Sequence, residues 1–560
     1  MLKNVRASGF VTVVLLVSLI QSAASFARAQ QQPQRERRAV PLATPTPSAT
    51  PTSVTTPSPT PTPSPAPAPA AKTSTPTATV AELQARILEI MRKPQLAPAM
   101  IGIKVASVET GKVLFEENAH KLLRPASNMK LYTVAAALDR LSPDYRFITS
   151  IYAAAKPDAK GFVRGDLILY GRGDPSIAAR FNNGDYLKAI NDLAARIAAA
   201  GVKRVEGDLV GDETYFIGPQ YGAGWEWEDL QWWYGAEVTS LTANDNALDL
   251  SIKPGPQVGA PALVTTGPPD PLLNIVNRVK TAPKGTRRDL SVYRGLASDE
   301  VEISGVIPID DRGYSGGLGI SRPALLFAYL LRSSLAQQGV IISGKTRTTG
   351  PLVSQSSIGN SPAVSSLVEV ASLHSPPLSL IAAQTMKPSQ NLYTELLLRT
   401  LGKVAAPATI PAGVDETSET AGIRVLRTFL QEASVNPSSL VLSDGSGLSR
   451  NDMITAEATL QLLMYMRRHR YANAFRDSLP IAGVDGTLRN RMKGTVAENN
   501  VRAKTGTLSS ASSLSGFVTS AAGEELVFSI MVNNYPQDSD PRALCIDPIA
   551  ILLASFMGRS

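Results

Sequence analysis

The sequence predicts an α/β fold of the α+β kind, in which helices flank an antiparallel sheet and an inserted β-rich module interrupts the chain. Three observations carry this prediction. Helical periodicity occurs early in the chain and returns from about residue 350, short β-type runs fill the stretch between, and the C-terminal region contains a β-hairpin. Helices before and after a hairpin pack as an α/β sandwich when their apolar faces cover its sheet.

The N-terminal segment is typical of an export signal. Lys3 and Arg6 form a positive start, residues 10–20 are apolar, and Ala27-Arg28-Ala29 matches a cleavage site. We therefore expect a signal peptide over 1–29 and an exported protein, in the periplasm or elsewhere in the extracytoplasmic cell envelope. The alternative is an uncleaved anchor, which would associate the protein with a membrane or the cell wall.

Residues 30–78 are rich in Pro, Thr, Ser and Ala and have too few apolar residues for a core, which predicts a disordered tether. Folding sequence starts near Val80, with a helix over residues 81–91. Strands follow at 100–107 and 113–116, and then a helix at 127–141.

Residues 151–345 are predicted to form a β-rich insert of two small domains. Its β-type runs lie at 147–152, 166–170, 204–210, 247–253, 290–293 and 301–306. All four tryptophans fall between Trp225 and Trp233. Such a cluster indicates either a core or domain contact or a platform for sugar stacking, and the sequence leaves both open.

The catalytic body is predicted to be discontinuous, over 79–150 and 346–560. Its second part contains expected helices at 389–401, 418–433 and 456–477, then hairpin strands at 512–520 and 525–533 and a closing helix at 549–556. The 560-residue chain is long enough for this division.

Composition excludes several function classes. The net charge of +8 is a weak excess without an aromatic-lined basic stripe, so we expect no nucleic-acid partner. The single cysteine, Cys545, lies in an apolar run and is expected to be buried. The three histidines have no metal-ligand spacing, so we expect neither a metal nor an organic cofactor.

Three short motifs follow one another in the chain: Ser127-Asn128-Met129-Lys130, Ser389-Gln390-Asn391 and Lys504-Thr505-Gly506. Each is weak alone, but their order is informative, because the first opens a predicted helix and the third lies on a strand before the hairpin. Together they supply the groups that acyl transfer needs without histidine.

Helical spacing places Ser127 and Lys130 on one face, so a neutral Lys130 is the candidate base for the Ser127 nucleophile. The start of the helix directs N–H groups toward an oxyanion. Lys504 would favour a neutral Lys130 and attract a substrate carboxylate, which the Thr505 hydroxyl would bind, and Gly506 would let the substrate backbone approach closely.

The Ser389–Asn391 motif completes the expected machinery. Ser389 would relay a proton to the leaving amine, and Asn391 would orient Lys130 and the substrate amide. Two neighbouring features have plainer interpretations: Asp444 with its glycines indicates a structural turn, and Glu395 is expected to be an ion-pair member.

On these motifs the chain resembles the penicillin-recognising serine enzymes, and within them the class C low-molecular-mass penicillin-binding proteins, the D-alanyl-D-alanine carboxypeptidase/endopeptidase family. Further matches are the segments Arg124-Pro125-Ala126-Ser127, Gly171-Arg172-Gly173-Asp174-Pro175 and Asp444-Gly445-Ser446-Gly447. The long insert between Lys130 and Ser389 also fits that family.

The resemblance implies a penicillin-recognising, transpeptidase-like sandwich and a serine D,D-peptidase that acts on peptidoglycan peptides, with β-lactams as covalent inhibitors. Ser127 would be acylated with Lys130 as the base, and Lys504, Thr505 and Thr507 would bind the substrate carboxylate. The backbone N–H groups of Ser127 and Thr507 would form the oxyanion hole. Two alternatives are a β-lactamase and a catalytically weak cell-wall-binding or scaffolding protein.

Overall fold

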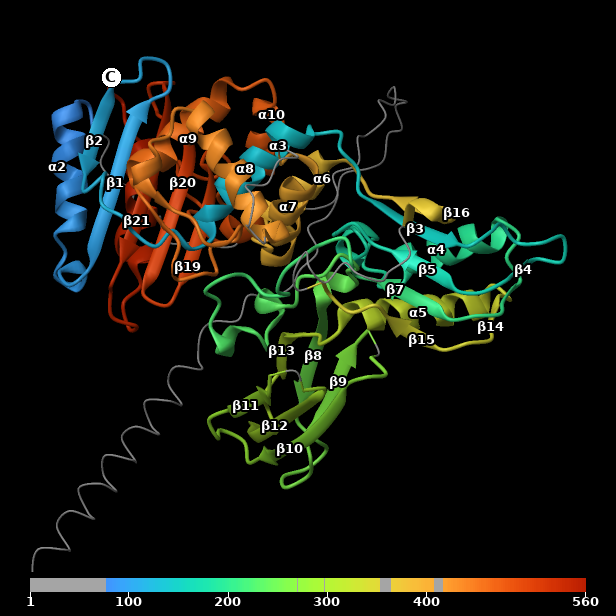
Figure 1. Ribbon diagram of the computed structural model, residues 1–560. Coiled ribbons are helices and arrows are strands. Elements are labelled where there is room, and N and C mark those ends of the chain that lie inside the picture. Colours follow the sequence, from blue (N-terminus) through green and yellow to red (C-terminus); the bar gives the residue numbers. More distant parts are fainter. Residues whose placement is uncertain (1–76, 269, 297, 353–363, 407–415) are drawn as a thin grey trace, which may run out of the picture.

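A computed structural model describes residues 77–268, 270–296, 298–352, 364–406 and 416–560 (Figure 1). The predicted signal peptide and all but the end of the predicted tether lie outside the described residues. Within the described ranges no helix has the length and the apolar composition that crossing a bilayer requires.

The body has one part before the insert and one after it, and is built on one five-stranded sheet in the order β19-β20-β21-β1-β2. All four pairings are antiparallel, and the C-terminal strand β21 lies against the early strand β1, with Ile530 opposite Ile103. The strands are β1 (Met100–Ser107), β2 (Val113–Glu117), β19 (Arg502–Leu508), β20 (Ala511–Thr519) and β21 (Glu525–Asn533).

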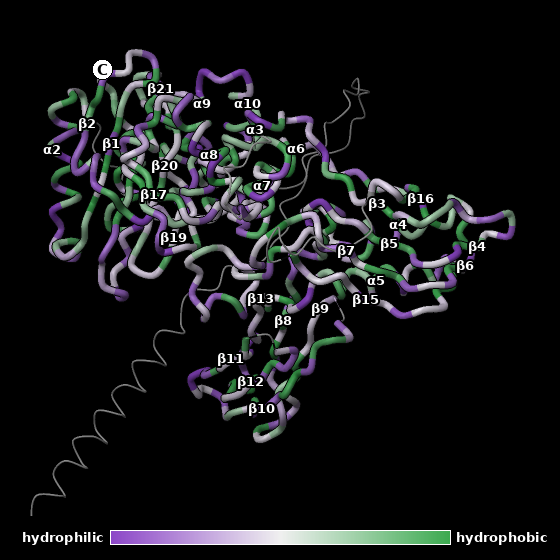
Figure 2. Tube along the Cα trace, viewed as in Figure 1, coloured by the Kyte–Doolittle hydropathy of each residue, from purple (hydrophilic) through white to green (hydrophobic). Residues whose placement is uncertain are grey.

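Helices cover both faces of this sheet (Figure 1). Because side chains alternate along a strand, Phe528 packs with α2 and α11 on one face, and Val527 packs with the helices on the other. In Figure 2 the end of α9 and the turn that joins it to α10, residues 467–471, are hydrophilic and lie outside this core. The helices are α2 (Val80–Met91), α3 (Met129–Leu141), α6 (Leu378–Met386), α7 (Asn391–Val404), α8 (Ser418–Glu432), α9 (Ala456–Arg468), α10 (Ala472–Ser478) and α11 (Asp547–Ala554).

The first part of the insert is a sheet in the order β15-β7-β5-β3-β16, with a short sheet β14-β6-β4 beside it. Its core includes residues of α4 and α5 as well as the strands. Two of its strands, β15 and β16, come from beyond the predicted boundary at residue 345. The elements are β3 (Ile148–Ala153), β4 (Phe162–Val163), β5 (Leu167–Tyr170), α4 (Lys188–Ala199), β6 (Arg204–Val205), β7 (Leu209–Asp212), α5 (Pro323–Gln337), β14 (Ile341–Ile342), β15 (Thr346–Thr348) and β16 (Val368–His374).

The second part of the insert contains two three-stranded sheets, β10-β12-β11 and β13-β8-β9, which share a separate small core. Figure 1 shows this part projecting away from the body. The strands are β8 (Ala247–Lys253), β9 (Leu263–Gly267), β10 (Asn274–Ala282), β11 (Asp289–Arg294), β12 (Glu300–Pro308) and β13 (Tyr314–Gly319).

The predicted fold class is confirmed, with local differences. The insert contains helices α4 and α5, which the sequence analysis did not anticipate, because their small and apolar residues did not stand out among the β-type runs. The expected helix over 456–477 is two helices, α9 and α10, with His469 at the end of the first. Cys545 is fully buried, as expected.

Candidate active site

Ser127 lies in a single 3₁₀ turn, Ala126–Asn128, that leads directly into α3. Its side chain is near the surface of the core, with the residue 9% exposed. Ala126 before it takes a left-handed φ of 48°, a conformation that non-glycine residues rarely adopt. The turn thus holds the serine at the start of a helix, as the sequence predicted.

Lys130 lies in the first turn of α3 and is fully buried. Its Nζ lies 3.1 Å from Ser127 Oγ, 2.6 Å from Asn391 Oδ1 and 2.7 Å from the Ser446 carbonyl. The last two oxygens can only accept. A neutral amine that donates one N–H to each of them directs its lone pair toward the Ser127 hydroxyl, which is the geometry of a base.

Asn391 is the first residue of α7, after the N-cap Gln390. Its Nδ2 donates to the Tyr234 carbonyl of the insert at 2.8 Å, which turns Oδ1 toward Lys130. The structure therefore brings together the first two motifs, and a backbone group of the insert fixes the amide that joins them.

Ser389 and Lys504 form the opposite side of the site. Ser389 takes a left-handed φ of 64° just before α7, and Lys504 Nζ donates to its Oγ at 2.8 Å. Both residues are buried, and Lys504 Nζ also donates to the Thr505 carbonyl at 2.7 Å. The third motif is thus in contact with the second, with a hydroxyl between the cation and the helix start.

Thr505 and Thr507 lie on β19, the edge strand of the sheet. Ala503 N–H points away from β20, because it donates to the Pro480 carbonyl. N–H groups two residues apart share a direction in an antiparallel strand, so those of Thr505 and Thr507 also face the open edge. Thr507 is exposed there, and Thr505 is buried.

Gly506 lies close to the chain before Ser127. A Cβ at this position would lie 2.2 Å from Ser513 Oγ and 2.5 Å from the Pro125 carbonyl. This close approach requires glycine, in addition to the predicted approach of a substrate backbone. This contact joins the strand that carries Lys504 to the turn that carries Ser127.

Thr487 is a site residue that lies outside the three motifs. Its hydroxyl lies 2.7 Å from the Thr505 hydroxyl, and its N–H donates to the Lys387 carbonyl. Lys387 in turn forms an ion pair of 2.5 Å with Asp485 of the same loop. The sequence pattern that could have indicated Thr487 is the turn Asp485-Gly486-Thr487, which precedes the third motif.

The 444–449 loop, residues Asp444 to Ser449, supplies the Ser446 carbonyl to Lys130, a contact that no motif announced. Asp444 makes it a turn, as expected, by accepting the N–H groups of Ser446, Gly447, Leu448 and Ser449. Burial would raise the pKa of Asp444, but hydrogen bonds from Asp452 and from these N–H groups hold it below its ordinary value.

Two further carboxyls lie beside the loop. Burial, with the charge of Asp444, raises the pKa of Asp452 well above its ordinary value. Glu395 Oε1 accepts the Gly445 N–H at 3.1 Å, and burial first, then the charge of Asp444, raises its pKa as well. A hydrogen bond to the loop, rather than the expected ion pair, holds Glu395.

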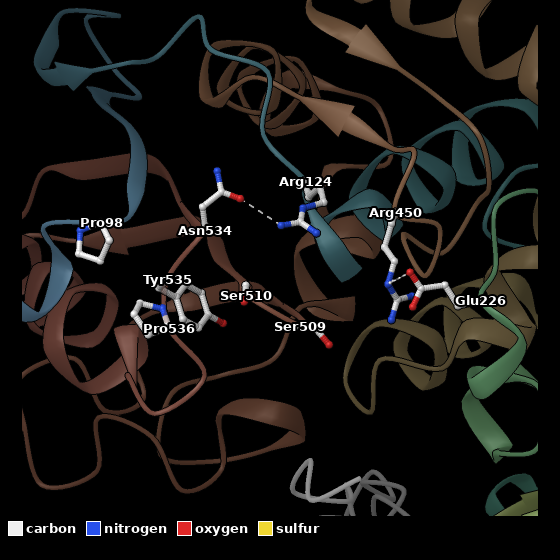
Figure 3. A pocket seen from close by; sticks show the side chains of 9 residues that line it. All are labelled: Pro98, Arg124, Glu226, Arg450, Ser509, Ser510, Asn534, Tyr535 and Pro536. Atoms are coloured by element: carbon white, nitrogen blue, oxygen red, sulfur yellow. Dashed lines mark hydrogen bonds and ion pairs between the residues drawn. The ribbon is translucent and has the colours of Figure 1, made fainter. Parts of the chain in front are cut away.

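A pocket of about 610 Å³ adjoins the segments that carry the site. Figure 3 shows Arg124 hydrogen-bonded to Asn534 and Arg450 paired with Glu226 across it. Arg124 comes three residues before Ser127, and Ser509 two residues after Thr507, so the pocket opens next to the reacting groups. It offers both cationic and acidic groups to a ligand.

Among the residues that the structure describes, one group of side chains elsewhere has ligand atoms close enough for a metal: Glu116, His120 and Glu457. Lys104 already lies among them, with its Nζ 3.0 Å from Glu116 and paired with Glu457. The lysine supplies the positive charge that these carboxylates need, so the group is accounted for as an ion-pair cluster.

The chain matches a family model described as the D-Ala-D-Ala carboxypeptidase 3 (S13) family over residues 83–555. A D-alanyl-D-alanine carboxypeptidase of Actinomadura sp. (strain R39) is 35% identical over 492 residues, which cover 86% of each chain. A penicillin-sensitive carboxypeptidase A of Dictyostelium discoideum is 26% identical and covers 79% of this chain and 84% of its own.

Among solved structures, penicillin binding protein 4 (dacB) from Haemophilus influenzae has the same fold. It superposes with a TM-score of 0.70 at 22% identity and covers 84% of this chain and 99% of its own. A second structure of that protein, complexed with a β-lactam, gives a TM-score of 0.65 at 20% identity over 83% of this chain and 97% of its own.

Proposed function

Because the chain belongs to the D-Ala-D-Ala carboxypeptidase 3 (S13) family, we propose that it is a serine D-alanyl-D-alanine carboxypeptidase/endopeptidase of peptidoglycan stem peptides. β-Lactams inhibit it by acylating Ser127. The observation that carries the proposal is the contact of Lys130 Nζ with Ser127 Oγ at 3.1 Å, with Asn391 and Ser446 accepting from the amine.

In acylation, Ser127 Oγ attacks the carbonyl carbon of the penultimate D-alanine and its proton passes to Lys130 Nζ. The N–H groups of Ser127 and Thr507 stabilise the oxyanion. The C–N bond then breaks, the leaving amine takes a proton through Ser389 Oγ, and water hydrolyses the ester on Ser127 in the second half-reaction. No redox step or organic cofactor enters this sequence.

Lys504, Thr505 and Thr507 bind the carboxylate of the leaving D-residue. Lys504 supplies the charge, and its bond to Ser389 Oγ at 2.8 Å places the relay hydroxyl beside the leaving group. Thr487, which contacts the Thr505 hydroxyl, orients that hydroxyl toward the carboxylate. A carboxypeptidase and an endopeptidase substrate both present this carboxylate, so one site serves both.

The test is intact mass spectrometry of the protein with and without benzylpenicillin, together with release of D-alanine from a D-Ala-D-Ala peptide. We expect one long-lived penicilloyl adduct in the native chain and none in Ser127→Ala, which also loses D-alanine release. Ser438→Ala is the matched control, because Ser438 is an exposed serine in another 3₁₀ turn.

Two outcomes would contradict the proposal. Absence of any adduct in the native chain would exclude the acyl-enzyme, and full D-alanine release by Ser127→Ala would exclude Ser127 as the nucleophile. Rapid turnover of the adduct would instead favour a β-lactamase.

The protein is proposed to act outside the cytoplasm, on the strength of the charged start, the apolar run of residues 10–20 and the cleavage site at residue 29. The N-terminal residue of the protein isolated from cells tests this. A mature chain that starts at Gln30 supports cleavage, an intact one that fractionates with membranes supports an anchor, and an intact one in the cytoplasm contradicts export.

A further inference from the structure

The insert reaches the 444–449 loop through one tryptophan. Trp225 Nε1 donates to Asp444 Oδ2 at 2.8 Å, across the boundary between insert and body. Beside it, a Cβ on Gly224 would lie 2.5 Å from Ser449 Oγ, so the insert backbone also packs directly on the loop. This contact gives a role to Trp225, one of the four clustered tryptophans, which the three catalytic motifs do not explain.

Asp444 holds the loop through both carboxylate oxygens. Oδ1 accepts the N–H groups of Ser446 and Gly447 at 3.0 and 2.6 Å. Oδ2 accepts the N–H groups of Leu448 and Ser449 at 3.1 and 2.9 Å, and the Ser446 hydroxyl at 3.0 Å. Asp444 is fully buried, so these bonds are shielded from water and are stronger than their exposed equivalents.

The loop in turn touches Lys130 and the turn that carries Ser127. The Ser446 carbonyl accepts from Lys130 Nζ at 2.7 Å. At Gly447, which has a φ of 74°, a Cβ would lie only 1.9 Å from the Ala126 carbonyl, so the loop lies against the turn before Ser127. A shift of the loop therefore changes the position of the Lys130 amine relative to the Ser127 hydroxyl.

We propose that Asp444 is a positioning residue for the Lys130 base and that Trp225 makes the insert a part of that device. Trp225 fixes Asp444, Asp444 fixes the 444–449 loop, and the loop directs one N–H of Lys130 away from Ser127. The inference rests on the proposed function, because it assigns Lys130 the role of base.

The effect belongs to the acylation step rather than to substrate binding, because neither residue faces the proposed carboxylate site on β19. Trp225→Phe keeps an aromatic ring and removes the N–H donor. Asp444→Asn replaces one acceptor oxygen with a donor, which then faces N–H groups. We expect the first-order acylation constant to fall about five- to tenfold in Trp225→Phe and about 100-fold in Asp444→Asn, with little change in the binding constant.

The experiment measures the rate of penicilloyl adduct formation by intact mass spectrometry over a range of benzylpenicillin concentrations, which separates the acylation constant from the binding constant. Rates refer to the fraction of protein that finally forms adduct, so misfolded molecules do not count. Trp227→Phe is the matched control, because Trp227 lies in the same cluster and is 54% exposed.

A lower acylation constant in Trp225→Phe, with the binding constant and Trp227→Phe at native values, supports the proposal. An acylation constant in Trp225→Phe equal to that of Trp227→Phe overturns the role of the insert, and a native constant in Asp444→Asn overturns the role of Asp444. If Asp444→Asn does not fold, Trp225→Phe decides alone. Absence of an adduct in the native chain would refute the proposed function itself. That result can be distinguished from an unchanged acylation constant in either variant.

Discussion

The body and the insert both bury ionisable side chains, and two lysines of the body can be compared with three carboxyls of the insert. In the body, Lys130 and Lys504 are fully buried and face hydroxyl, amide and carbonyl oxygens that come from other elements. In the insert, Asp174, Glu213 and Glu237 are buried, and desolvation raises the pKa of each.

These buried lysines and carboxyls differ in the groups to which they are hydrogen-bonded. The buried lysines of the body have acceptors arranged so that one amine can take a proton from a serine. The buried carboxyls of the insert accept N–H and hydroxyl groups of their own surroundings: Asp174 from Ser176, and Glu237 from Tyr221 and Arg322. Burial of the two lysines therefore serves the proposed chemistry, and burial of these insert carboxyls serves local geometry.

The largest effect is expected from removing the buried amine of the body. Lys130→Met keeps the side-chain length and removes the base, so acylation by benzylpenicillin should slow by about 10²- to 10⁴-fold. Time-resolved mass spectrometry of the adduct measures this rate.

The matched control for that experiment is Lys104→Met, which removes a lysine that is buried away from the site and pairs with Glu116 and Glu457. It should lower the thermal midpoint and leave the acylation rate of the folded protein unchanged. If Lys130→Met acylates within tenfold of the native rate, Lys130 is not the base, and the proposed difference between Lys130 and Lys104 is wrong.

A second, smaller effect concerns the buried carboxyl of the insert. Burial raises the pKa of Asp174 to about 6. The folded protein therefore holds this proton more tightly than the unfolded chain, and the associated stability is complete at low pH and is lost as pH rises through about 6. Asp174→Asn removes this loss and should be more stable than the native chain at pH 8, by at most about 3 kcal/mol.

Thermal unfolding of both proteins at pH 5 and pH 8 tests this prediction. The advantage of Asp174→Asn should shrink on going from pH 8 to pH 5. An advantage that is the same at both pH values would show that Asp174 does not titrate in the folded insert.

The smallest effect is expected from a buried hydroxyl of the body. Tyr132 OH lies 2.9 Å from Thr459 Oγ1, and burial raises the Tyr132 pKa far above neutral pH. Tyr132→Phe should lower the free energy of unfolding by about 1 kcal/mol, and equally at pH 5 and pH 8. The same thermal unfolding series measures this decrease in unfolding free energy. A decrease that differs between pH 5 and pH 8 would contradict the prediction that Tyr132, unlike Asp174, does not titrate in this range.

The sequence analysis predicted the α/β class and most elements, because their periodicity is local. Strands β1, β8 and β21 begin and end where the sequence indicated. The insert helices α4 and α5 were not predicted, because the short β-type runs around them led to the assignment of the whole region as β-rich. The contact of Gly506 with the Pro125 carbonyl, which would lie 2.5 Å from a Cβ at this position, was not predicted, because nothing in the sequence places these two segments together.

By itself the sequence determined the proposed reacting groups and their order. Ser127 and Lys130 are three residues apart, and in a helix this spacing places them on one face. Only the tertiary structure decided how Lys130 is held. Asn391, Ser446, Tyr234 and Trp225 come from segments far from α3 in the chain, and packing of the body against the insert sets their distances. Contacts between distant segments depend on the whole fold, so no local pattern announces them.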